Sequence, residues 1–333
     1  MTNKEIAQRT VDRMIDTINS TGYLPWAKPW TTGPAGRPMV RVDDGYTTIT
    51  ITPRHWNRAG KPYSGINPLL LDMSGHTGEW ITFNQAKAEG GKVRKGAKGQ
   101  TILYWNMIKK ETDELDDEGK KIVKTIPVLK YYTVFSIADI EGLETKHHPA
   151  PEVIVIPKWH WEAVEGEEEA DPLNVAAESI IASYIDRCQT LTVERTGNSD
   201  RAYYSPALDH VVVPNVKQFP QVEEYYSTLF HELGHSTGHV SRLDRFRGKE
   251  AAAAWGDENY SKEELVAEIT AASILTTLGM ETGNSFRNSA AYVKSWSEHI
   301  KDDPMMFVSA AGKASAAIDL ILGTAAQPGE VTA

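Results

Sequence analysis

Residues 222–238 constrain the fold of this chain more than any other stretch. Apolar and aromatic residues recur there at intervals of three and four, which predicts an amphipathic helix, and Gly238 lies where a helix end is favoured. The helix carries His231 and His235, which are four residues apart and therefore share one face, with Glu232 beside the first. The fold must bury one side of this helix while both imidazoles point to one place.

The His-Glu-Leu-Gly-His pattern over residues 231–235 is typical of a zinc hydrolase. Two neutral imidazoles hold Zn²⁺, a third protein ligand completes the set, and one position stays open for water. The adjacent carboxylate, Glu232, accepts the proton of that water and passes it to the leaving group. Residues 209–215 precede the helix as an extended stretch, where we expect an edge strand that pairs with an extended peptide substrate. The pattern predicts one catalytic Zn²⁺, and the alternative is two solvated histidines on an ordinary helix.

The third metal ligand must come from another part of the chain. A histidine at position 241 would supply it from the same segment, but the sequence has Ser241. A second predicted helix, residues 261–279, carries Glu264 and Glu268 four apart on one face. We assign Glu264 to the metal and Glu268 to a hydrogen bond that fixes the tautomer of a ligating imidazole. The reverse assignment of the two carboxylates is the alternative.

Further polar residues near the motif are weaker candidates. His239 follows the motif by one turn, but a helix that ends near residue 238 places it away from the metal. Tyr260 or His210 could donate a hydrogen bond to the oxyanion of the transition state, and a structural role suits either of them as well. We assign Tyr260, with Glu232, to the catalytic residues, and we expect Glu263 to be solvated.

The composition is that of a soluble globular protein. Hydrophobic residues make up 41% of the 333 residues, which is too many for a disordered chain, and the length favours two domains. The single cysteine, Cys188, excludes an internal disulfide and a cysteine-rich zinc site. No signal peptide or long uncharged apolar run is apparent, so we predict a cytoplasmic protein without a membrane partner.

Charge is distributed unevenly along the chain. Basic residues outnumber acidic ones two to one over residues 1–110, whereas acidic residues dominate the remainder, and the whole chain has a net charge of -10. Aromatic residues alternate with cations in the basic part, an arrangement that suits stacking on unpaired bases and contact with phosphates. Packing of most of these aromatic rings in a core is the structural alternative. We predict that single-stranded DNA, with double-stranded DNA as the alternative ligand, contacts Trp26, Lys28, Trp30, Trp56, Tyr63, Lys92, Arg94, Lys95 and Lys98.

Breaks in the pattern indicate how the chain is organised. The charged run over residues 109–121 separates two strand-like stretches and predicts the loop of a hairpin. Glycine, proline and acidic residues after residue 143 predict a connector. We therefore predict an α+β chain with an α/β DNA-binding domain over 1–143, a linker over 144–172, a metallopeptidase domain over 173–322 and a disordered tail over 323–333.

Motifs along nearly the whole chain resemble those of one known family. In the first half they are PWAKPW (25–30), KPYSGINPLLL (61–71), WITFNQAKAEGGKVRKGAKG (80–99) and YYTVFSIADIEGL (131–143). In the second half they are AYYSPALDHVVVP (202–214), YYSTLFHELGHSTGHVSRLDR (225–245) and YSKEELVAEITAA (260–272). The chain thereby resembles the ArdC-type antirestriction proteins. The resemblance implies an N-terminal single-stranded-DNA-binding domain and a C-terminal zincin-like metallopeptidase domain, with His231 and His235 as ligands, Glu232 as base and residues 264–268 as the source of the third ligand.

The same resemblance implies a protein of a plasmid, phage or other mobile element that protects incoming DNA from host restriction. The first hypothesis is a zinc peptidase that its N-terminal domain directs to DNA, where it cleaves a protein of unknown identity. The alternatives are a non-catalytic DNA-binding protection factor with structural zinc, and a peptidase that cleaves a regulatory DNA-bound protein. Glu232 favours catalysis, because a structural zinc site needs no such carboxylate. A nuclease is disfavoured, since nucleases usually hold their metals through several carboxylates.

Overall fold

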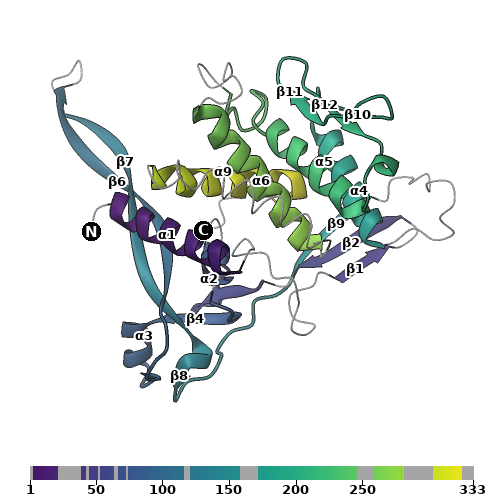
Figure 1. Ribbon diagram of the computed structural model, residues 1–333. Helices are drawn as coiled ribbons and strands as arrows, with labels where there is room; N and C mark the ends of the chain where they lie inside the picture. Colours follow the sequence, from purple (N-terminus) through teal and green to yellow (C-terminus); the bar gives the residue numbers. More distant parts are fainter. Residues whose placement is uncertain are drawn as a thin grey trace.

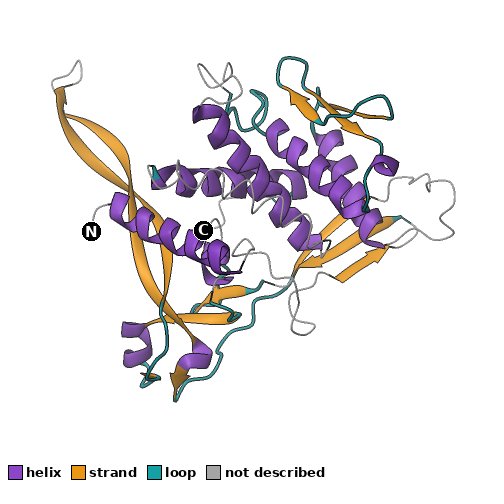
Figure 2. Ribbon diagram, in the orientation of Figure 1, coloured by secondary structure: helices purple, strands orange, loops and turns teal. Residues whose placement is uncertain are grey.

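The computed structural model describes residues 3–21, 39–42, 45–51, 53–63, 67–72, 74–115, 121–157, 172–246, 258–278, 280 and 303–324. Helices and strands are mixed along the chain, as expected for an α+β fold. Most of the long helices gather in one region, and a long two-stranded hairpin projects from the molecule at the other side (Figure 1, Figure 2).

The first half of the chain is rich in strands. Its elements are α1 (Asn3–Thr21), β1 (Met39–Val42), β2 (Tyr46–Ile51), β3 (His55–Asn57), α2 (Asn67–Asp72), β4 (Gly78–Thr82), α3 (Phe83–Ala88), β5 (Lys92–Val93), β6 (Gln100–Leu115), β7 (Lys121–Ser136), the 3-10 helix η1 (Ile137–Asp139), β8 (Ile140–Glu141) and β9 (Glu152–Pro157). One sheet has the order β3-β4-β7-β6, a second the order β1-β2-β9, and β5 pairs with β8. A capping box between Thr82 and Gln85 starts α3 directly after β4.

The hairpin predicted around residues 109–121 is confirmed, but its strands extend further than expected. Strand β6 continues to Leu115 and β7 begins at Lys121, so most of the charged run is strand rather than loop. The physical reason is the position of the run in a two-stranded ribbon. Both faces of such a ribbon can be solvated, and charged residues are tolerated there while their backbones pair.

The second half is dominated by helices. Its elements are α4 (Pro172–Arg187), β10 (Thr192–Thr196), β11 (Tyr203–Ser205), β12 (His210–Pro214), the 3-10 helix η2 (Val216–Gln218), α5 (Val222–Ser236), α6 (Glu258–Leu278) and α9 (Pro304–Leu322). Strand β12 pairs in parallel with β10 and in antiparallel with β11. The expectation that residues 209–215 supply an edge strand is therefore wrong, because β12 is paired on both sides. In the described residues the edges of this sheet are β10 and β11.

The two helices predicted around the metal motif are confirmed as α5 and α6. Helix α5 ends at Ser236, close to the expected Gly238. Helix α6 begins at Glu258, three residues before the expected start at Ser261, so that serine lies inside the helix. Helix α9 is long and apolar enough to cross a membrane by length and composition alone, but half of that stretch is buried inside the protein. Its packing against α1 and α6 accounts for its apolar character.

Core packing joins α1 and β9 to the helices of the second half. Helix α1 buries Ala7 and Val11 in a cluster with residues of α6 and α9. Strand β9 lies within residues 144–172, the expected linker, and buries Ile154 and Ile156 together with residues of α4. The period-2 alternation of these isoleucines with exposed valines explains why this segment is a strand. The domain limits given above stay a prediction, and the tail beyond Thr324 lies outside the described residues.

Candidate metal centre

Close packing of α5 on α6 brings the predicted site together. Gly234 lies in the middle of the motif, and a Cβ placed there would stand 3.1 Å from Ala267 Cα, closer than real Cβ atoms usually approach. The missing side chain lets the two helices approach at this point. Ser236 and Tyr184, whose hydroxyls lie 3.0 Å apart, anchor the end of α5 to α4. The motif is thus held rigidly against the helix that carries the two candidate carboxylates.

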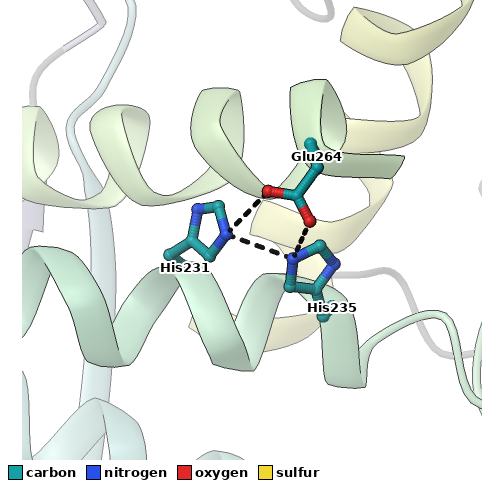
Figure 3. A group of neighbouring side chains, drawn as sticks. All are labelled: His231, His235 and Glu264. Carbon is teal, nitrogen blue, oxygen red and sulfur yellow. Dashed lines mark hydrogen bonds and ion pairs between the residues drawn. The ribbon is translucent and has the colours of Figure 1, made fainter. Parts of the chain in front are cut away.

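Three side chains converge at this contact (Figure 3). The Nε2 atoms of His231 and His235 are 3.1 Å apart. The carboxylate of Glu264 lies between them, with one oxygen 3.4 Å from His231 Nε2 and the other 3.2 Å from His235 Nε2. Within the described residues, these three form the group of histidine, cysteine and carboxylate side chains whose donor atoms lie close enough to hold one metal ion.

The donor atoms fit a tetrahedral zinc site. Ligands about 2.0–2.2 Å from one tetrahedral ion lie roughly 3.3–3.5 Å from each other. The two imidazole nitrogens are 3.1 Å apart, and each lies 3.2–3.4 Å from an oxygen of Glu264, a different oxygen for each histidine, so the spacing is close to that value. Two imidazole nitrogens and one carboxylate oxygen are also the donors that catalytic zinc sites use. The geometry therefore agrees with the expectation that Glu264, rather than Glu268, completes the ligand set.

A carboxylate also faces the other ring nitrogen of each histidine. Glu268 lies 3.4 Å from His231 Nδ1, which is the position expected for it. Glu263 lies 3.7 Å from His235 Nδ1 and is also bound by Arg245, whose Nε donates to it at 3.0 Å. Glu263 is therefore not solvated, contrary to the expectation. Such carboxylates fix which ring nitrogen carries the proton and so leave Nε2 free for a metal.

The electrostatics of the cluster favour positive charge where the three side chains meet. Burial lowers the pKa of His235, but hydrogen bonds to Glu263 and Glu264 outweigh it and raise the pKa to about 10. Burial also opposes ionisation of Glu264, yet the two histidines hold the pKa of its carboxyl well below the ordinary value. Glu232 differs from both, since burial raises the pKa of its carboxyl. A raised pKa makes Glu232 the better proton acceptor of the two carboxylates.

The segment after α5 folds back and fixes the end of the helix. Arg242 pairs with Asp209 at the turn before β12, and its Nε donates to Ser236 O at 2.8 Å. Asp209 also accepts a hydrogen bond of 2.8 Å from the hydroxyl of Tyr204 in β11. Arg245 also holds the end of α5. It donates to Gly234 O at 2.9 Å and binds Glu263. The two arginines therefore tie the motif to the sheet and to α6.

The weaker candidates of the sequence lie around this centre without joining it. His239 Nδ1 is 2.8 Å from Ser241 Oγ, outside the three-residue cluster. His210 contacts Thr192 and Glu194 of β10, which suits a role in the sheet. Tyr260 lies in α6, four residues before Glu264, and its side chain falls outside the described residues.

The predicted DNA-binding residues divide into three groups. Trp26, Lys28 and Trp30 lie outside the described residues, while Lys92, Arg94, Lys95 and Lys98 are all exposed in β5 and the loop that follows it. Trp56 is half-buried beside the ring of His148, and its Nε1 is buried without a hydrogen-bond partner in the described part of the chain. Tyr63 packs against a small core, and burial raises its pKa to about 12. The exposed cations are thus better placed for a ligand than these two rings.

Two known domain families match the chain. Residues 4–135 match the N-terminal domain of the anti-restriction factor ArdC, and residues 184–313 match a zincin-like metallopeptidase. The antirestriction ArdC protein from plasmid R388 is 31% identical in sequence to this chain. Its metal-free crystal structure matches with a TM-score of 0.62 over 96% of this chain and 99% of that one. Its Mn(II)-bound form matches with the same TM-score. Together with the zincin-like domain, that form indicates a divalent metal.

Longer proteins are also similar to this chain. The DNA primase TraC of Escherichia coli is 34% identical over 332 residues, which cover 96% of this chain and 27% of TraC. The chain thus spans about a quarter of the length of that relative. An uncharacterised protein of Sinorhizobium fredii, y4eC, is 28% identical over 268 residues, with 78% of each protein covered.

Proposed function

Because this chain belongs to the ArdC antirestriction family, we propose that it protects the incoming DNA of a mobile element from host restriction. In this proposal the N-terminal part binds single-stranded DNA, and the C-terminal part cleaves a peptide bond in a protein substrate of unknown identity. The convergence of His231, His235 and Glu264 beside Glu232 carries the proposal, because a site built this way suits hydrolysis. The proposed place of action is the cytoplasm.

Zinc is the proposed metal. Imidazole nitrogens with one carboxylate are donors that zinc accepts readily, and a site of three protein ligands leaves a position open for catalysis. When bound, the ion supplies a Lewis acid that polarises the scissile carbonyl and makes water more acidic. His231 and His235 would hold it through Nε2 and Glu264 through its carboxylate, while Glu263 and Glu268 keep the protons of the imidazoles on Nδ1.

Glu232 is the proposed general base. Its carboxylate would take the proton of the attacking water and deliver it to the nitrogen of the leaving amine. Burial of the side chain supports this role, since the raised pKa of Glu232 brings it closer to working pH. The backbone of Tyr204, in the edge strand β11, partly offsets this rise in the pKa of Glu232. We also propose that Tyr260 donates a hydrogen bond to the developing oxyanion.

Local positive charge supports the proposed binding of DNA. The chain as a whole carries a net charge of -10, which would repel phosphates. The exposed segment with Lys92, Arg94, Lys95 and Lys98 concentrates four cations where none of them is covered by the core. Binding of single strands through such a segment is expected to weaken steeply as salt is added.

A single substitution tests whether hydrolysis is the biological role. Glu232→Gln keeps the size of the side chain and removes its capacity to accept a proton. The variant and the parent should be compared for zinc content, affinity for oligo(dT) and protection of incoming DNA in a restricting host. Glu223→Gln, in the first turn of the same helix, is the matched control.

We expect Glu232→Gln to keep zinc and DNA binding and to lose protection, while Glu223→Gln keeps all three. If Glu232→Gln protects DNA as well as the parent does, the protein acts by binding DNA, and the metal stabilises its structure.

A further inference from the structure

The base of the β6–β7 hairpin presents an open two-stranded surface. Strand β4 pairs with β7 from Val134 to Ser136 and ends at Thr82. Towards the tip, β7 continues with β6 as its ladder partner in the described residues, and the ribbon projects from the body of the protein (Figure 1). Side chains on this part of the ribbon are therefore accessible to a long, flexible ligand.

The register places two tyrosines and a lysine on one face of this ribbon. Tyr104 lies opposite Lys130, and Ile102 lies opposite Tyr132. Because side chains alternate between faces, residues two apart in each strand share a face, so these four side chains point the same way. Tyr104 is 56% exposed and Tyr132 is 46% exposed, and Lys130 is exposed beside them. Diagonal neighbours of this kind lie about 7–8 Å apart, so both rings can be reached by one ligand.

The inner end of this face is anchored to a core. Ile102 packs with Tyr63 against the buried side chains of Leu71, Trp80 and Val134. The opposite face is also supported, since Leu103 is buried in the cluster that contains α1 and α6. The tyrosines therefore stand on strands held from both sides, and a ligand need not order them on binding.

The chemistry of the exposed face suits unpaired bases. Aromatic rings stack on the flat face of any base, and a cation between them offers a contact for phosphate. Strand propensity explains why tyrosines occur in β6 and β7, but it does not select one face for both rings and the lysine. The exposed basic segment ends at Lys98, two residues before β6 begins, so phosphate contacts can continue from it onto the ribbon.

We propose that Tyr104 and Tyr132, with Lys130 between them, form a base-stacking platform for single-stranded nucleic acid. This inference rests on the proposed function and assigns a second surface to it, beyond the basic segment of residues 92–98. Binding then combines phosphate contacts at that segment with stacking on the ribbon. Binding at the platform should not depend on the base sequence of the strand, because every base has a face that can stack.

The test compares variants of the full chain for affinity to fluorescein-labelled oligo(dT) and to a duplex of equal length. Tyr104→Leu and Tyr132→Leu remove the rings and stay apolar, whereas Tyr104→Phe and Tyr132→Phe keep the rings. Tyr131→Leu, on the opposite face of the same strand and 39% exposed, is the matched control. Circular dichroism and zinc content show whether each variant is folded.

We expect each leucine variant to bind oligo(dT) roughly 5- to 100-fold more weakly, with duplex binding unchanged. The phenylalanine variants and Tyr131→Leu should bind like the parent. Lys130→Gln should reduce the salt dependence of binding by about 0.7 in the log–log slope, as expected for the loss of one phosphate contact.

Three results would overturn the inference. If the parent binds oligo(dT) and the leucine variants bind it equally well, the platform is wrong and the proposed function stands. If Tyr131→Leu weakens binding as much as they do, the loss reflects damage to the hairpin. If the parent itself does not bind oligo(dT), the platform and the proposed DNA-binding function fail together.

Discussion

Gly234 of α5 lies directly against Ala267 of α6, so that a Cβ on the glycine would stand 3.1 Å from Ala267 Cα and 3.4 Å from its carbonyl oxygen. The proposed metal ligands flank this contact on both helices. His235 is the next residue after Gly234, and Glu264 lies one turn before Ala267. The distance between the histidines and the carboxylate is therefore set by how closely these two helices approach.

Gly234→Ala should damage the metal centre without touching a ligand. The added methyl group must push α6 away or distort α5, and overpacking of this kind typically costs about 1–3 kcal/mol of stability. We expect a lower free energy of unfolding and a lower zinc affinity, measured by urea titration and by competition with a chelator. Gly312→Ala in α9 is the control, because nothing lies within 4 Å of its Cβ position. Unchanged zinc affinity in Gly234→Ala would show that helix spacing does not set the site.

Glu263→Gln should weaken zinc binding although Glu263 is not a proposed ligand. The substitution removes the charge that faces His235 Nδ1. Loss of such a partner typically lowers metal affinity by roughly 10- to 100-fold. Glu178→Gln is a matched control, since Glu178 is likewise paired with an arginine, Arg195, and is not one of the carboxylates that face the two histidines. If both variants bound zinc like the parent, Glu263 would serve only to hold Arg245.

Asp209→Asn should change the acid stability of the protein. Burial opposes ionisation of Asp209, but Arg242, Thr190 and Tyr204 outweigh it and lower its pKa to about 2. Because this lies below the unfolded value of about 3.9, the carboxylate stabilises the fold above about pH 4 by roughly 2.5 kcal/mol. That contribution is lost as the pH falls from about 4 towards 2.

Urea unfolding at a series of pH values measures this contribution. The asparagine variant should be less stable than the parent at pH 7, and its stability should fall less between pH 4 and pH 2. Asp200→Asn, at a fully exposed position, is the control and should follow the parent. A variant with the parent's pH profile would mean that the ion pair with Arg242 does not stabilise the fold.

Much of the candidate metal centre could be predicted from the sequence, because helical periodicity is a local property. The spacing of His231 and His235, and of Glu264 and Glu268, already places each pair on one face of a helix. The pairing of Glu263 with Arg245 could not be predicted in this way. It depends on a segment after α5 that folds back onto α6. The periodicity of a helix does not predict how such a segment folds.

The order of strands β10, β12 and β11 in their sheet could not be predicted for a similar reason. The stretch around β12 is recognisable as a strand, but its place between β10 and β11 is decided by long-range pairing. The aromatic residues of the first half show the same limit. Trp80 is buried whereas Tyr104 and Tyr132 are exposed, and the difference follows from where β4 ends beside β7. Composition reveals the aromatic content of the domain but not which rings face solvent.

Diffraction from crystals grown with zinc, recorded on both sides of the zinc absorption edge, tests the proposed metal centre most directly. We expect one anomalous peak about 2.0–2.2 Å from Nε2 of His231, Nε2 of His235 and a carboxylate oxygen of Glu264. Glu268 should remain at His231 Nδ1. A peak bound by Glu268 in place of Glu264, a peak bound by His239, or no peak at these residues would contradict the proposed metal centre.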